Sequence, residues 1–287
     1  MKFLLVASHP NESALEALYT AKSWLEEHQV ITEVVLSDDL VLSHPVYDDV
    51  VSRVPGFDLV CAFGGDGTLL RAARVVAGTE IPLLGFNYGN VGFLAGATPE
   101  VLIEALEAFL AGDVVFEQRV MIEATSLYAD GSQSVCYALN EVFIGRSDLG
   151  RSIRMDLSIN DDHLFELRGD GAIVATATGS TAYALAAGGP LLTPGHRGLC
   201  VVPVCSHPYV TPAIVTAPND IVELKIHPQP DQSVLIHVDG QIVPPTDVSL
   251  CSLQVSRAPV DLTLVRYNTP DFYARLAALF DGVHHAR

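Results

Sequence analysis

Three glycines and one aspartate stand together where a buried strand pattern meets a helix pattern, in the run Phe63-Gly64-Gly65-Asp66-Gly67-Thr68. Glycines free the backbone for positive φ and for close approach of a ligand. The following helix presents unpaired N–H groups and the positive end of its dipole, which suits a phosphate. An acid beside a phosphate adds repulsion unless it serves a metal ion or a hydroxyl group. We therefore expect phosphoryl transfer, with Asp66 serving either a metal ion or a hydroxyl group; a bare glycine turn between strand and helix is the alternative. The expected phosphate-binding loop consists of Gly64, Gly65, Gly67 and Thr68.

The other common phosphate and dinucleotide motifs are missing from the sequence. A P-loop needs a lysine followed by Ser or Thr after its glycines, and none of Lys2, Lys22 and Lys225 follows a glycine loop. The HRD and DFG triplets of protein kinases are absent. No GxGxxG follows the first strand pattern, which disfavours hydride transfer of the usual Rossmann type.

A second candidate is the pair Asn140-Glu141, inside the apolar, strand-like run 135–144. Adjacent residues in a strand point to opposite faces, so at least one of these polar groups needs a partner. A carboxylate accepts hydrogen bonds from two ribose hydroxyls, and an amide both donates to and accepts from an adenine edge. The pair is therefore a candidate nucleoside-binding element. The alternative is two buried polar groups that neighbouring loops satisfy.

The longest motif runs from Arg168 through Gly169-Asp170-Gly171 to Tyr183 and ends near Gly188-Gly189-Pro190. A strand flanked by glycines leads into small hydroxyl residues that open a helix. Backbone N–H groups and hydroxyls in such a segment can hold a phosphate or a ring edge. A plain strand and a capped helix remain the alternative.

The elements that must position these motifs alternate in the first part of the chain. Apolar spacing predicts strands over 2–8, 30–36, 58–63 and 81–86, and helices over 13–28, 67–76 and 99–110. This alternation is typical of a parallel sheet with helices on its faces, so we expect an α/β domain over residues 1–115.

The rest of the chain is mostly β. Hairpin signals at 129–132 and 160–162 each separate two strand patterns, and five or six further strand patterns follow between 199 and 267. Only 181–187 suggests a helix there. We expect a β-rich domain over 116–268. Residues 269–287 carry a final amphipathic helix that we expect to pack back on the first domain.

Composition limits the class of protein. The 287 residues carry a formal net charge of −18, which argues against nucleic-acid binding. No apolar run reaches the roughly 18 residues of a membrane span, and the five scattered cysteines read as free thiols. We therefore expect a soluble, cytoplasmic protein. Because there are only three lysines, an anionic substrate also favours Mg²⁺ or another divalent cation as cofactor, with no ligands assigned to it.

Taken together, the motifs resemble those of the NAD kinase family over nearly the whole chain. The resemblance rests on the glycine turn, on 85–94, on Asn140-Glu141, on 169–183 and on Val238-Asp239-Gly240-Gln241. It implies a Rossmann-like α/β domain followed by a β-rich NAD-binding domain, and a homodimer or homotetramer. It also implies transfer of a phosphate from ATP or polyphosphate to the 2′-hydroxyl of the adenosine ribose of NAD, giving NADP.

The resemblance assigns roles residue by residue. Asp66 is similar to the acid that contacts the hydroxyl to be phosphorylated, with Gly67 beside it, and Phe93 to the ring that borders the adenosine pocket. Asn140 and Glu141 match the pair that reads the adenosine. The remaining NAD-binding candidates are Arg168, which would meet the new phosphate, and Asp170, Thr181, Ala182, Tyr183 and Ala186.

The chain departs from the family pattern at a few positions. Ala177 stands where the family usually has Pro, and Ala186 where it often has Ser. Two alternatives stay open: another kinase with a GGDG-type loop, either phosphofructokinase-like or a lipid kinase, and an inactive dinucleotide-binding sensor. The choice of donor, a preference for NAD over NADH, and inhibition by NADP also stay open.

Overall fold

The computed structural model describes residues 1–89, 92–147, 152–207, 211–228 and 234–285. Its chain divides into two compact units. The first comprises Met1–Arg119 together with Asp261–Arg287, and the second comprises Val120–Val260.

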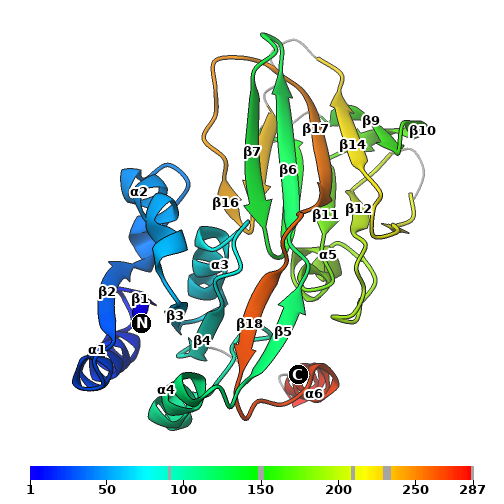
Figure 1. Ribbon diagram of the computed structural model, residues 1–287. Helices are drawn as coiled ribbons and strands as arrows, with labels where there is room; N and C mark the ends of the chain where they lie inside the picture. The colour runs from blue at the N-terminus through cyan, green and yellow to red at the C-terminus, as the bar shows by residue number, and fades with distance from the viewer. Residues whose placement is uncertain (90–91, 148–151, 208–210, 229–233, 286–287) are drawn as a thin grey trace. The chain divides into compact units, whose positions relative to one another are not determined.

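The first unit is built on a six-stranded sheet in the order β2-β1-β3-β4-β18-β5 (Figure 1). Its strands are β1 (Lys2–Ala7), β2 (Ile31–Leu36), β3 (Leu59–Gly64), β4 (Leu83–Asn87), β5 (Val115–Arg119) and β18 (Leu262–Arg266). All neighbours pair parallel except β5, which runs antiparallel to β18. β3 is buried along its whole length, as its continuous apolar run requires in a sheet covered on both faces. The predicted α/β class is confirmed.

Helices cover both faces of this sheet. α1 (Glu12–Glu27) and α4 (Leu102–Ala111) share one apolar core with the strands. α3 (Asp66–Val75) lies on the other face, where Leu69 fills the space left by Gly85. α2 (Pro45–Arg53) contacts α3, and α6 (Phe272–His285) ends the unit. Short 3₁₀ turns occupy Ser37–Asp39, Val54–Gly56 and Pro99–Val101.

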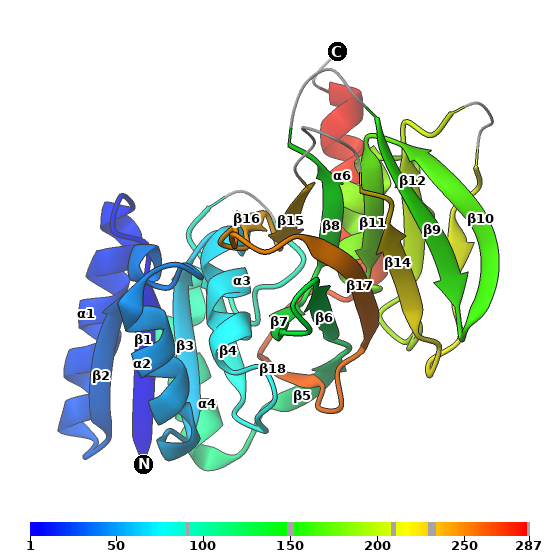
Figure 2. The same cartoon turned by 90° about the horizontal axis from the view of Figure 1, so that it is seen from above.

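The second unit contains two six-stranded antiparallel sheets. One has the order β10-β9-β14-β17-β6-β7, and Figure 2 shows β9, β10 and β14 side by side. Its strands are β6 (Ile122–Tyr128), β7 (Gln133–Ala138), β9 (Ile153–Ile159), β10 (Asp162–Gly169), β14 (Val222–Ile226) and β17 (Leu250–Arg257).

The other sheet has the order β13-β12-β11-β8-β15-β16. Its strands are β8 (Glu141–Arg146), β11 (Gly171–Ala175), β12 (Cys200–Val204), β13 (Ile214–Val215), β15 (Val234–Val238) and β16 (Gln241–Ile242). A 3₁₀ turn (Gly179–Thr181) and the short helix α5 (Tyr183–Ala186) follow β11.

Both predicted hairpins are confirmed. β6 pairs with β7 across a turn in which Gly131 has φ of 82° and the Asp130 side chain accepts from the Ser132 N–H. β9 pairs with β10 across Asn160 and Asp161, whose φ values are 52° and 69°. Asparagine and aspartate tolerate this left-handed conformation better than most residues, which is why the sequence signal was clear.

Three expectations about elements differ from the structure. The single strand expected over 135–144 is two strands, β7 and β8, in different sheets, with Leu139 and Asn140 in the break. α2 forms in a stretch that carried too few apolar residues to predict a helix. β5 and β18 pair within the first sheet, so the first unit extends to Arg119 and resumes at Asp261, whereas the sequence placed these limits at 115 and 269. Apolar patterning predicts a strand but not its partner.

No helix in the described part of the chain is long and apolar enough to cross a membrane.

Candidate functional site

The glycine turn of the first unit joins β3 to α3. β3 ends at Gly64, Gly65 occupies the position before the helix, and Asp66 is the first helical residue. A Cβ on Gly64 would lie 2.4 Å from Oγ1 of Thr68, so the turn closes only with glycine there. No side chain of the described residues caps this helix end. The Thr68 N–H donates to the Gly65 carbonyl, and the N–H groups of the first two helical residues are available to an anion.

The Asp66 carboxylate is held from the opposite side by the segment 92–95. It accepts hydrogen bonds from the backbone N–H groups of Phe93 and Leu94. A Cβ on Gly92 would lie 2.1 Å from Oδ1 of Asp66, so this close approach requires glycine. Burial raises the pKa of Asp66, while the two N–H groups and the positive charge of Arg275 lower it. The first unit thus brings together the predicted Asp66, Gly67 and Phe93.

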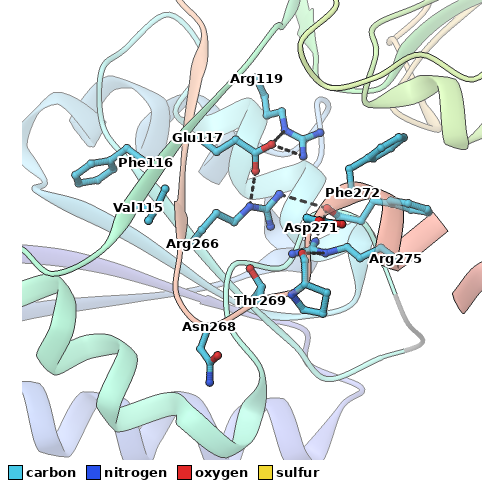
Figure 3. Close-up of a pocket in the computed structure, with 12 residues that line it drawn as sticks. Val115, Phe116, Glu117, Arg119, Arg266, Asn268, Thr269, Asp271, Phe272 and Arg275 are labelled. Carbon is cyan, nitrogen blue, oxygen red and sulfur yellow. Dashed lines mark hydrogen bonds and ion pairs between the residues drawn. The ribbon is translucent and has the colours of Figure 1, made fainter. Parts of the chain in front are cut away.

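A cavity of about 430 Å³ lies next to this segment, also within the first unit (Figure 3). Its charged lining includes three arginines: Arg119 of β5, Arg266 of β18 and Arg275 of α6. Glu117 forms ion pairs with Arg266 at 2.6 Å and Arg119 at 2.7 Å. The sequence interpretation missed these residues, because Arg119 and Arg266 stand at strand ends and Arg275 in the first turn of a helix, without any motif of their own.

In the second unit, three separate sequence motifs converge on the turn at Leu139 and Asn140. The Asp239 carboxylate accepts from the N–H groups of Leu139 at 2.9 Å, Asn140 at 2.7 Å and Glu141 at 3.2 Å. Thr176 donates its hydroxyl to the Leu139 carbonyl at 2.6 Å. A Cβ on Gly179 would lie 2.1 Å from the Asn140 carbonyl oxygen, so the long glycine-to-tyrosine motif lies directly against this turn.

Glu141 is the buried acid of this cluster, with only 7% of its surface exposed. It accepts from the Tyr183 backbone N–H, while its Oε2 is buried without a hydrogen-bond partner among the described residues. Burial, and then the negative charge of Asp239, raise the pKa of Glu141 to about 8. A buried oxygen without a partner is costly, which marks it as a place for a ligand donor.

The reason given for the Asn140-Glu141 pair was wrong in one respect. The two residues are not neighbours within one strand, because Asn140 lies in the break before β8 and Glu141 begins that strand. The break leaves backbone N–H groups without a strand partner, and the Asp239 carboxylate accepts from those of Asn140 and Glu141.

The remaining predicted residues of this unit occupy several places. Thr181 donates its hydroxyl to the Thr178 carbonyl at 3.0 Å, and Ala182 and Tyr183 open α5. The Tyr183 ring meets Phe143 edge-on at 5.6 Å, and Ala186 is exposed at the end of the helix.

Arg168 and Asp170 lie at the passage from one sheet to the other. Arg168 is exposed on the edge strand β10, where its Nε donates to the Ser152 hydroxyl at 3.0 Å. Asp170 follows that strand and forms an ion pair with Arg146 at 2.7 Å.

One group of three potential metal ligands occurs in the described residues: Asp156, Glu166 and His227, with ligand atoms within 4.8 Å of one another. Arg154 already engages both carboxylate oxygens of Glu166, at 2.8 and 3.0 Å. The group also contributes an imidazole, which Mg²⁺ disfavours. It therefore does not fit the cation expected for phosphoryl transfer.

Comparison with known proteins finds NAD kinase domains in both parts of the chain. Residues 49–114 match the family described as ATP-NAD kinase N-terminal domain, and residues 139–264 match ATP-NAD kinase C-terminal domain. A curated NAD kinase of Azoarcus sp. (strain BH72) is 36% identical over 254 residues, covering 88% of this chain and 83% of the relative. The NAD kinase of Heliobacterium modesticaldum is 34% identical over 272 residues, covering 94% of each.

Solved structures show the same fold. Yeast NADH kinase complexed with NADH superposes with a TM-score of 0.83 at 20% identity, covering 98% of this chain and 87% of that one. An NAD kinase from Archaeoglobus fulgidus in complex with ATP gives a TM-score of 0.74 at 23% identity, covering 99% of each.

Proposed function

This chain belongs to the NAD kinase family and phosphorylates NAD, and we propose that Asp66 is the residue that receives the reacting 2′-hydroxyl of the adenosine ribose. One observation carries the proposal. The backbone N–H groups of Phe93 and Leu94 fix the Asp66 carboxylate at the first turn of α3, beside helix N–H groups that no side chain of the described residues caps. An acceptor for a hydroxyl and donors for a phosphate therefore lie at one turn.

The reaction at this turn is an in-line attack of the ribose hydroxyl on the terminal phosphorus of the donor. Such transition states are loose, so alignment and charge stabilisation count for more than removal of the proton. Asp66 accepts the hydroxyl's hydrogen bond, orients its oxygen and receives the proton as the new P–O bond forms. The terminal P–O bond of the donor breaks in the same step, and ADP or the shortened polyphosphate leaves. The N–H groups at the start of α3, with Gly67 and Thr68, hold the phosphoryl oxygens.

The second unit supplies recognition of the nucleoside in this proposal. The partnerless Oε2 of Glu141 accepts from a ribose hydroxyl, and Asn140 reads the adenine edge. The family resemblance supports further contacts with the dinucleotide from Phe93, Arg168, Asp170, Thr181, Ala182, Tyr183 and Ala186.

A divalent cation, Mg²⁺ or Mn²⁺, completes the proposal. Mg²⁺ in kinases is bound mainly by substrate phosphates and water rather than by an all-protein cage. This agrees with the described residues, which offer one three-ligand group that does not fit Mg²⁺. The cation would enter with the donor phosphates and neutralise their charge.

A direct test of the function is an acceptor and donor screen. NAD, NADH, fructose 6-phosphate and diacylglycerol are each offered with ATP or inorganic polyphosphate, and the product is detected by coupled assay or chromatography. We expect NADP from NAD with at least one donor. Turnover of the sugar or the lipid in place of NAD would contradict the assignment, and tight NADP binding without turnover would favour an inactive sensor.

Substitution of Glu141 by Gln gives a pH-dependent prediction. In the protein without NAD, the pKa of Glu141 is about 8. Wild-type NAD affinity should therefore rise as the pH increases from 6.5 to 9 and the carboxylate forms. At pH 9 the amide should weaken NAD binding by about 1–3 kcal/mol, since it satisfies one hydroxyl at most. At pH 6.5 the wild type must first lose a proton, at a cost of about 2 kcal/mol, so the two proteins should bind alike.

Calorimetry at both pH values, in two buffers of different ionisation enthalpy, measures this effect together with the proton release. Glu123→Gln is the control, because that carboxylate accepts from Tyr137 elsewhere in the same unit. Parallel pH curves for wild type and Glu141→Gln would assign Glu141 a purely structural role.

We also expect a homodimer or homotetramer, on the family resemblance alone. Light scattering behind a sizing column at micromolar concentration measures the mass against the 30.7 kDa of one chain. A monomeric mass under these conditions would refute it.

A cytoplasmic location remains our proposal as well. None of the five cysteines, all of which lie in the described residues, forms a disulfide, as a reducing compartment allows. Fractionation of the producing cell tests it, and recovery of the protein with periplasmic or membrane fractions would overturn it.

A further inference from the structure

Residues 93–95 form hydrogen bonds in two opposite directions. On one side, the N–H groups of Phe93 and Leu94 donate to the Asp66 carboxylate. On the other side, carbonyl groups of the same segment accept from arginines. Arg275 Nη1 donates to the Phe93 carbonyl at 2.8 Å, and Arg266 Nη1 donates to the carbonyls of Leu94, at 3.0 Å, and Ala95. The same short segment thus joins the arginines to the acid.

The two arginines are themselves fixed. Arg266, whose side chain is 11% exposed, donates its Nε to Glu117 at 2.6 Å. Glu117 also pairs with Arg119, which is 6% exposed. Arg275 donates its Nε to the Pro270 carbonyl at 2.9 Å, at the beginning of α6. Guanidinium groups held at several atoms lose little further entropy and keep their orientation.

The cavity beside them is basic, yet it does not fit a phosphate. Each nitrogen of the Arg266 guanidinium donates to Glu117 or to a carbonyl of residues 93–95, so an incoming anion would have to break these bonds. Glu117 and Asp271 add two negative charges to the lining. Arg266 and Arg275 therefore bind the protein's own backbone rather than a phosphate.

We propose that Arg275 and Arg266 are positioning residues for Asp66, which they hold in place and keep ionised through the peptide groups of residues 93–95. The inference rests on the proposed role of Asp66. A guanidinium bonded to a carbonyl polarises the peptide, and its N–H becomes a stronger donor to the carboxylate. One peptide group, between Phe93 and Leu94, makes this link. Its carbonyl accepts from Arg275 at 2.8 Å and from Arg266 at 3.4 Å, and its N–H, that of Leu94, donates to Asp66.

The surrounding charges agree with this arrangement. The positive charge of Arg275, from α6, lowers the pKa of the Asp66 carboxyl. Burial, and then repulsion from Arg266, lower the pKa of Arg275 to about 10, with a smaller contribution of the same sign from Arg119. Glu117 and Asp66 oppose these effects. Arg275 therefore remains charged near neutral pH.

The test compares Arg275→Gln and Arg275→Lys with wild type. Carboxyl carbons are labelled with [4-¹³C]Asp, and the Asp66 signal is assigned by its loss in Asp66→Asn. In Arg275→Gln the titration midpoint of Asp66 should move upward by about half a unit to one unit, since a partly screened positive charge is lost. The acid limb of kcat should move by the same amount, and the plateau should fall about tenfold as the segment loosens.

Arg275→Lys separates charge from geometry. Lysine keeps the positive charge, so the Asp66 midpoint should stay near the wild-type value. It cannot make the two hydrogen bonds of the guanidinium, so the kcat plateau should still fall. Arg53→Gln is the matched control, because it removes an arginine paired with Glu33 and Asp49 in the same unit, and we expect its midpoint and kcat to match wild type.

An Asp66 midpoint unchanged in Arg275→Gln, with normal melting, would overturn the inference. The NMR titration needs no turnover. If the wild type failed to phosphorylate NAD, the proposed function would fall while the titration still decided the link between Arg275 and Asp66.

Discussion

Asp66→Asn is expected to lower kcat by about 10²–10⁴-fold while the fold and much of the dinucleotide affinity remain, a loss of roughly 3–5 kcal/mol of transition-state stabilisation. Asparagine has nearly the same shape and can begin α3 at the same turn. Its amide oxygen still accepts from the N–H groups of Phe93 and Leu94, which hold the acid in the wild type. The amide cannot receive the proton of the ribose hydroxyl. Because loose phosphoryl transfer depends weakly on deprotonation, the lower part of the range is expected if Asp66 mainly orients the hydroxyl.

The measurement is kcat at saturating NAD and donor, with NAD binding by calorimetry and unfolding by thermal melting. Asp38→Asn is the control, because Asp38 is a half-exposed carboxylate paired with Arg71 of α3, away from the turn. If the mutant melts normally, binds NAD and turns over within about threefold of wild type, Asp66 has no catalytic role.

Chelation by EDTA is expected to abolish activity, and excess Mg²⁺ or Mn²⁺ to restore it. The chain carries a net charge of −18 and only three lysines, so it has few side chains with which to neutralise the donor phosphates. The turn that receives them begins with an acid, which adds repulsion when no cation is present. The phosphates would then be neither neutralised nor aligned.

NAD binding and thermal melting are the controls in the same chelator. Both should stay unchanged if the cation acts with the donor, because the described residues hold no three-ligand group suited to Mg²⁺. Undiminished turnover in chelator would show that the protein neutralises the donor by itself. A large fall in melting temperature would indicate a structural ion instead.

The local parts of the fold and site were accessible from sequence, and the non-local parts were not. The glycine turn was predicted because glycine spacing, a buried strand and a helix start all occur within a few residues. The Asn140-Glu141 pair was found, but its setting was misread, because the break before β8 depends on Asp239, about a hundred positions later. Arg266 and Arg275 gave no signal at all. Their role exists only because β18 and α6 return to the first unit. The return of the final helix was expected from sequence, but no local pattern showed that β18 would join the first sheet or that these arginines would meet residues 93–95.

The interrupted first unit has a consequence for the order in which the protein folds during synthesis. β18 lies between β4 and β5 in its sheet, although it follows the whole second unit in the chain. Domains usually fold in the order in which they leave the ribosome. Here Val120–Val260 is complete before the strand that joins β5 to the first sheet has been made. The nascent N-terminal part must therefore wait with an open edge at β4, and a chain truncated before Leu262 would keep that edge exposed to aggregation.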